Sequence, residues 1–273
     1  MVFRLFASTI PPKILPTFSL HFWITSTLPH LRYRGFDPNI SHFASDFVSR
    51  SLFLQKYMQY PRFAALLRLS MKYDMEGVRK ILVHRIQKHY PVGIFDYEQV
   101  MKVHGTAAAA TFTLPPHPNE VLKLFWECDV KQCLPVAFYE ATVRGVNSLT
   151  SSRPKVSLPK HILTPAFKAL AIFNSKNADH VRDTLDTLRA CNICRRTNLI
   201  SIEHSLLPNR IDLSLSPLRV RELKSDVLKI PCETCTTETL DDGRAFRYAF
   251  WDELPGMFGL PTWRELSKFV ILK

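Results

Sequence analysis

Residues 63–91, FAALLRLSMKYDMEGVRKILVHRIQKHYP, decide the fold class, because apolar side chains recur along them with a helical period. Leu66 and Leu67 belong to an apolar stripe on the first half of the stretch. Asp74 can cap a second helix, and Pro91 is expected to end it. The stretch therefore predicts two short amphipathic helices in a mainly α protein.

Helical patterns continue beyond this pair. An Ala-rich connector with three prolines is expected around 104–118. Four further helices are predicted after it: from about Asn119, over 134–142, over 158–173 and over 177–190. A proline-glycine turn region is expected between the aromatic residues of 250–263.

We expect three parts in the chain: an irregular leader over 1–50, a helical region over 51–190 and a loop-rich, cysteine-paired module over 191–273. The leader contains an uncharged stretch at 14–31. Because Pro16, Pro29 and several hydroxyl residues interrupt that stretch, a membrane-spanning helix is not expected there.

The net charge of +12 raises the question of nucleic-acid binding. The excess is spread thinly, and residues 191–273 carry twelve Lys and Arg against eleven Asp and Glu. Phosphate binding depends on clustered cations, whose release of counterions supplies the affinity. The charge distribution therefore does not favour a nucleic-acid partner.

The six cysteines include two C-x-x-C pairs, Cys191 with Cys194 and Cys232 with Cys235. Each pair can present two thiolates about 3.5–4 Å apart, the edge length of a zinc tetrahedron. Four sulfurs leave no open coordination position, so the metal would be structural. The 37 residues between the pairs exceed the usual spacing, and four reduced, partly buried thiols are the alternative. His204 is a further alternative ligand in place of one sulfur.

Two catalytic interpretations of these cysteines fail. Pro231-Cys232-x-x-Cys235 matches half of the zinc deaminase signature, but no histidine is followed two residues later by the required Glu. A thioredoxin-like role needs an alternating strand-helix pattern around the pair, which is not found near Cys191. We therefore expect a protein that is not an enzyme.

The helix pair resembles the end of the BTB/POZ domain in a large fungal family of BTB-domain proteins. The resemblance extends to 134–142, to both cysteine pairs and to 251–266, and it covers about residues 62–270. The matching residues of the helix pair are Leu67, Arg68, Leu69, Ser70, Lys72, Tyr73, Asp74, Val78, Arg79, His84 and Pro91.

The resemblance implies a protein-protein adaptor that feeds substrates to a cullin-type ubiquitin ligase. The cysteine pattern is more typical of an intracellular metal site than of a secreted disulfide framework, so a cytoplasmic or nuclear location is expected. Self-association is the alternative to another protein partner. Only about 60 residues precede the resemblance, and their start does not look like the strand-rich BTB core. Helices made to cover that sheet would then expose their apolar faces. The expected partner-binding stripe is Leu66, Leu67, Val78, Leu82 and Ile86.

Two other functions stay open at this point. The charge and the cysteine pairs are compatible with a zinc-dependent regulator associated with DNA or chromatin. The short amino-terminal part is compatible with a truncated fragment without independent function.

Overall fold

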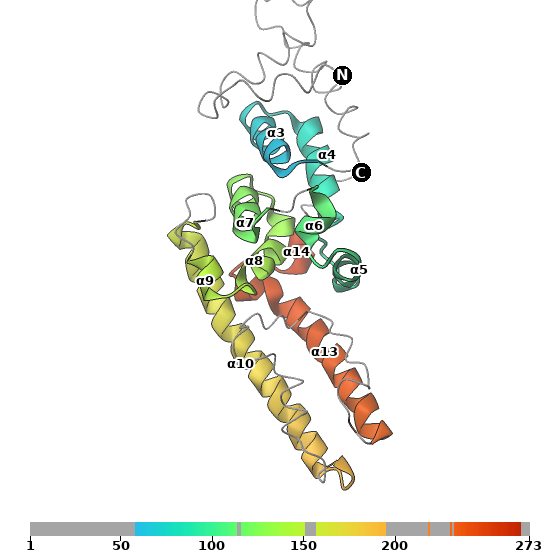
Figure 1. Ribbon diagram of the computed structural model, residues 1–273. Coiled ribbons are helices and arrows are strands. Elements are labelled where there is room, and N and C mark those ends of the chain that lie inside the picture. The colour runs from blue at the N-terminus through green and yellow to red at the C-terminus, as the bar shows by residue number, and fades with distance from the viewer. Residues whose placement is uncertain are drawn as a thin grey trace, which may run out of the picture. The chain divides into compact units, whose positions relative to one another are not determined.

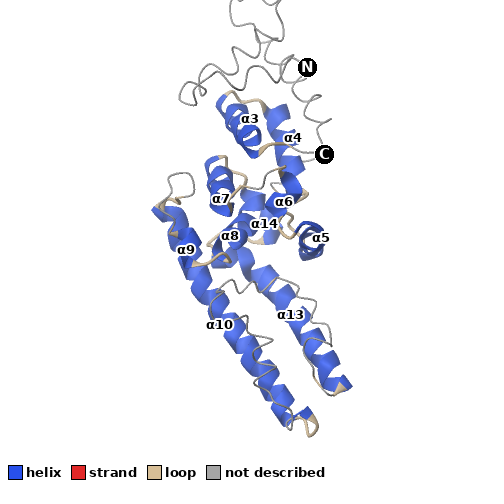
Figure 2. Cartoon of the chain, in the orientation of Figure 1, coloured by secondary structure: helices blue, strands red, loops and turns tan. Residues whose placement is uncertain are grey.

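Helices make up almost all of the regular structure in the computed structural model (Figure 2), which confirms the mainly α prediction. No sheet forms among the described residues, where one isolated bridge joins Met58 to Phe112. The described residues belong to a compact unit bounded by Gln55 and Lys273, and the expected leader over 1–50 lies outside them. The structure describes residues 58–113, 116–150, 157–194, 218, 230 and 232–268.

The predicted helix pair consists of α3 (Tyr60–Lys72) and α4 (Glu76–Gln87). Asp74 does not cap α4, which corrects the sequence prediction. Its backbone has a φ of 48°, in the left-handed region that short polar residues tolerate in turns, and Met75 is the N-cap residue. Three residues, Tyr73 to Met75, therefore turn the chain before α4 begins.

The apolar stripe of the helix pair is buried, so the expectation that it is exposed is wrong. Leu67, Val78, Leu82 and Ile86 are all 0% exposed, and Leu66 is partly exposed. Helices α3 and α4 pack on each other, and α4 also packs on the short 3-10 helix at Lys131–Cys133. The stripe is thus buried within the chain and does not form an exposed apolar face.

Helix α8 (Leu134–Thr142) is the centre of the next group of helices. All nine of its residues are buried, and its bounds confirm the sequence prediction. Sequence reasoning did not predict α5, and it treated α6 as part of a connector. The surrounding helices are α5 (Ile94–His104), α6 (Ala107–Thr111), α7 (Pro118–Glu127) and α9 (Val146–Leu149).

Helices α10 (Lys160–Ala190) and α13 (Glu233–Met257) lie side by side and antiparallel in Figure 1. Sequence reasoning divided α10 into two helices, which is wrong. The two long helices are joined by an ion pair between Lys176 and Glu253 at 2.9 Å and by His180 stacked on Phe246 at 4.3 Å.

The part of this hairpin farthest from α8, which we call the hairpin end, comprises residues 177–194 and 232–246. Its apolar contacts come from Val181, Leu185 and Leu188 of α10. Cys194 and Cys235 complete this narrow seam, and Ile230 packs against it.

Helix α13 continues through Pro255 to Met257, where a turn was expected. A proline has no N–H for the carbonyl four residues earlier, here that of Trp251. The indole N–H of Trp263 donates to this carbonyl at 2.6 Å and supplies the missing hydrogen bond. The prediction of a loop-rich final third is therefore wrong for its described residues, which are mostly helical.

The other end of the hairpin joins the group of helices around α8 through an aromatic core. Phe250 of α13 packs edge-on against Phe173 of α10, with ring centroids 5.0 Å apart, and both rings contact Tyr139 of α8. Phe138 stacks on Phe258 at 4.7 Å. We call the described residues 58–113, 116–150, 157–176 and 247–268 the body.

In the part of the chain that the structure describes, no helix is long and apolar enough to span a membrane.

Candidate metal centre

The two cysteine pairs lie at two helix ends that face each other across the hairpin. Cys191 is the C-cap residue of α10, and Cys194 follows in the next turn. Cys232 is the N-cap residue of α13, and Cys235 lies in its first turn. Because the helices are antiparallel, the end of one and the start of the other bring together cysteines that are far apart in sequence.

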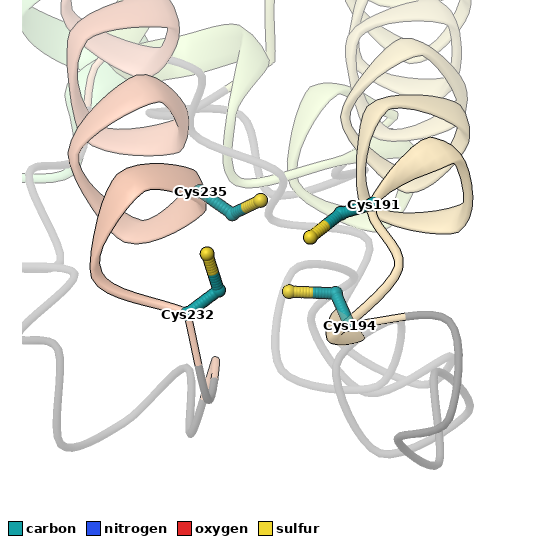
Figure 3. A group of neighbouring side chains, drawn as sticks. All are labelled: Cys191, Cys194, Cys232 and Cys235. Atoms are coloured by element: carbon teal, nitrogen blue, oxygen red, sulfur yellow. The ribbon is translucent and has the colours of Figure 1, made fainter.

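The four predicted ligands point toward one another (Figure 3). Their Sγ atoms all lie within 4.8 Å of one another. A zinc ion with Zn–S bonds of about 2.3 Å holds its sulfurs about 3.8 Å apart, so small side-chain movements suffice to close the tetrahedron. Thiolates are soft ligands that suit zinc, and the donor set therefore fits the metal.

The centre continues the apolar seam of the hairpin. On α10 the buried residues Val181, Thr184 and Leu188 are followed at the same helical spacing by Cys191. On α13 the first buried side chain of the seam is Cys235. The sulfur atoms thus occupy the position where the next layer of apolar side chains would stand.

Hydrogen bonding and burial act in opposite directions on these thiols. Hydrogen bonds from the backbone N–H groups of Cys194 and Ile193 lower the pKa of Cys191 to about 7. Burial raises the pKa of Cys194 and of Cys235 above the usual value for a thiol. The buried pair therefore resists ionisation without a cation, and a divalent metal among the sulfurs would favour the thiolate form of both.

No protein family, characterised protein or solved structure matches this chain. The case for a metal therefore depends on the four sulfur atoms and on what surrounds them. Among the described residues, this is the one group of cysteines, histidines and carboxylates with a geometry suited to a metal ion.

The remaining candidates differ clearly from this set. His204, the alternative ligand, lies outside the described residues. Cys128 and Cys133 are buried in the body, where burial raises the pKa of Cys128 to about 11 and that of Cys133 further. They behave as small apolar core residues.

Sequence reasoning found the four ligands but not their setting. It expected both pairs on loops, whereas each pair includes a residue that caps a long helix. A usable signal was present in the sequence, because Leu188 and Cys191 continue the spacing of the apolar stripe that begins at Val181.

Proposed function

We propose that the chain is a non-enzymatic protein-interaction protein whose helical hairpin is stapled by one structural zinc ion. The observation that carries the proposal is the meeting of four cysteine sulfurs at the hairpin end. Four protein ligands complete a tetrahedron and leave no position for a substrate or an activated water. A metal bound in this way supports the fold and does not carry out a reaction.

A staple at this place has a clear physical purpose. The apolar cluster of the hairpin end consists mainly of Val181, Leu185 and Leu188, with the cysteines beside them. Burial of a few side chains gives about 1.5–3 kcal/mol each, which does not offset the entropy of ordering two long helix ends. Zinc binding is coupled to folding in such sites and supplies the missing free energy.

The resemblance of the helix pair to BTB-domain proteins supports a protein partner, either a second copy or a cullin-type ubiquitin ligase. Since the stripe on α3 and α4 is buried, other side chains are better placed to meet a partner. Phe95 and Val103 of α5 are 63% and 73% exposed. They lie eight residues apart and so share one face of the helix, and we propose this face as the contact surface.

Elemental analysis of the purified full chain tests the zinc part of the proposal, with an expected content of about one zinc per chain. Copurification with a cullin, together with the molecular mass in solution, tests the interaction part. We expect a Phe95→Asp, Val103→Asp double variant to lose the partner and to keep the zinc. Val146→Asp on α9, at a side chain 43% exposed, is the matched control. A monomer that retains no cullin would contradict the interaction role.

A second candidate function, a zinc-dependent regulator bound to DNA or chromatin, is favoured by one observation. Lys80 and His84 of α4 and its C-cap residue Lys88 are exposed at intervals of four residues, and Lys80 also pairs with Glu76 at 2.8 Å. If these basic side chains contact phosphates, duplex DNA should bind at low salt and dissociate steeply as the salt concentration rises. Absence of binding at low salt would exclude this candidate.

A further inference from the structure

Helix α5 has one face that holds it on the body and one face that is open to solvent. Ile94 and Tyr97 are buried, and the Tyr97 ring lies 5.2 Å from that of Trp251 and 6.1 Å from that of Tyr139. The open face spans an arc of about 120° around the helix axis. We call it the α5 face, and its side chains are all exposed: Phe95, Asp96, Gln99, Lys102 and Val103.

The α5 face is held in place before any partner arrives. Glu98 of α5 accepts a hydrogen bond from Nε of Arg247 on α13 at 3.3 Å, and these side chains are only 15% and 18% exposed. The indole N–H of Trp251 donates to the carbonyl of Val92, just before the helix, at 3.0 Å. Because the helix is fixed at these points, a partner does not have to offset the entropy of ordering it.

The residues of the α5 face are arranged symmetrically about Gln99. Phe95 lies four residues before Gln99, and Val103 lies four residues after it. Asp96 lies three residues before Gln99, and Lys102 lies three residues after it. When two copies of this face cross at Gln99 in opposite directions, each apolar side chain lies level with an apolar one of the other copy. Each charge likewise lies level with the opposite charge.

Charge favours the antiparallel direction over the parallel one. The first turn of α5 carries Asp96, and the last turn carries Lys102 and His104. Antiparallel copies bring the acidic start of one helix beside the basic end of the other, once on each side of the crossing point. Parallel copies would instead bring like charges together at both ends, which is unfavourable.

We propose that the α5 face binds a second copy of this chain, with the two α5 helices antiparallel and a two-fold axis at Gln99. The inference rests on the proposed function, which makes this face the contact surface, and it names the partner. Phe95 and Val103 supply the apolar contacts. Because both copies use the same surface in a two-fold contact, the assembly closes as a dimer and does not extend into a filament.

The size of the α5 face limits the strength of the dimer. Helix α5 has 11 residues and is therefore about 16 Å long. A face of this length buries less than the roughly 800 Å² per partner that a standard stable interface buries. We therefore expect a weak dimer, with a dissociation constant on the order of 10–100 µM.

Sedimentation equilibrium of the zinc-loaded full chain, from about 5 to 500 µM, tests the self-association. The average mass should rise from that of one chain toward that of two. A Phe95→Asp, Val103→Asp double variant should stay monomeric over this range. Val146→Asp, which also places a charge at an exposed apolar side chain, lies outside α5 and should dimerise like the wild type. A wild type that stays monomeric, or a double variant that dimerises equally well, would overturn the inference.

Reversal of the charges tests the direction of the two helices. Asp96→Lys and Lys102→Asp should each weaken the dimer about fivefold or more at low salt, because each places like charges level with each other on both sides of the axis. The double variant with both changes restores opposite charges at each level and should regain most of the affinity. In a parallel pair neither single change would add a like-charge contact. A double variant that binds no more tightly than the single variants would therefore contradict the antiparallel arrangement.

A cross-link tests the axis without any change of charge. In Gln99→Cys the two introduced thiols meet at the axis, and air oxidation should yield two linked copies of the tryptic peptide 89–102. In Asp96→Cys the two sulfurs are about 9 Å apart along the helices, so this matched variant should not link to itself. A Gln99→Cys protein without linked peptide, or an Asp96→Cys protein that links as readily, would overturn the proposed axis.

The outcomes separate this inference from the proposed function. A chain that stays monomeric and retains a cullin through the α5 face contradicts the inference alone. A chain that binds neither a second copy nor a cullin contradicts the interaction part of the proposed function as well. The zinc content should be the same in all of these variants, because α5 lies in the body and the four cysteines lie at the hairpin end.

Discussion

The body and the hairpin end are closed in different ways. The body buries whole aromatic rings, and residues from α8, α10 and α13 meet in its core at Tyr139, Phe173 and Phe250. Among its described residues, the hairpin end has two helices and one narrow seam, and four sulfurs stand where the last layer of side chains would be. Under the proposed function, a metal ion among the four sulfurs supplies to the hairpin end the stability that aromatic packing supplies to the body.

The largest expected effect comes from removing one side of the staple. A Cys191→Ser, Cys194→Ser double variant should lose the zinc ion, of which the wild type is expected to hold about one per chain, because two sulfurs do not complete the tetrahedron. The hairpin end should then lose protection against amide hydrogen exchange, whereas the body keeps it.

Cys128→Ala is the control for this experiment, since Cys128 is a buried thiol of the body. It should lower stability and leave the zinc content unchanged. Equal hydrogen exchange at the hairpin end of the double variant and the wild type would show that the seam is sufficient without metal.

Replacing a large buried side chain of the body with alanine should instead lower the free energy of unfolding. Phe138 is fully buried and stacks on Phe258, so Phe138→Ala leaves a cavity and is expected to cost about 3–5 kcal/mol of unfolding free energy. Phe95→Ala, at a ring 63% exposed, should change it by less than about 0.5 kcal/mol. Urea unfolding of zinc-loaded protein measures both, and similar losses in the two variants would contradict the distinction between core and surface.

The body also contains a carboxyl group that titrates near neutral pH. Glu140 of α8 is 6% exposed, and burial raises its pKa from 4.5 to about 7, although the Ala107 N–H donates to it at 2.7 Å. The folded state thus retains a proton that the unfolded state releases. Relative to Glu140→Gln, the unfolding free energy of the wild type should fall by about 3 kcal/mol as the pH rises through the interval between these pKa values.

Chemical unfolding over this pH range measures the effect of Glu140. A constant difference between wild type and Glu140→Gln would show that the carboxyl group has the same pKa in both states. The zinc content of the two proteins should be equal at neutral pH, because Glu140 lies in the body.

The smallest expected effect concerns α14 (Trp263–Ser267), which begins with a capping box. The Thr262 hydroxyl accepts a hydrogen bond from the backbone N–H of Glu265, and the Glu265 carboxylate accepts one from the backbone N–H of Thr262. Thr262→Ala should cost about 1 kcal/mol, while Thr262→Ser should cost less. Thermal unfolding of the three proteins measures the difference, and equal transitions would show that the cap is not needed.

Local patterns predicted the short helices of the body well. Helix α8 has the predicted bounds, because a continuous apolar run with a proline in its first turn specifies a buried helix start. The helix pair α3 and α4 also follows its apolar periodicity. What covers the pair was not predictable, since it depends on residues distant in sequence.

The long helices were less predictable, because packing overrides local signals there. The sequence prediction ended one helix at 173 and began another at 177, yet the apolar stripe on both sides stays in phase and one helix results. Pro255 suggested a turn, but the helix continues through it. The indole N–H of Trp263, from another helix, donates to the Trp251 carbonyl that the proline leaves without a partner. Sequence spacing identified the four cysteines, whereas their meeting depends on the antiparallel hairpin.

The position of the cysteines on the seam limits how the length of the hairpin can change. An insertion of one residue between Val181 and Cys191 would rotate the cysteine by about 100° around α10 and direct its sulfur away from α13. Insertions of seven or eleven residues return it to within about 20° of its direction. A compensating insertion in α13 is needed as well, because the two helix ends must stay level. Changes in hairpin length are therefore expected as insertions or deletions of about seven or eleven residues, made in both helices together.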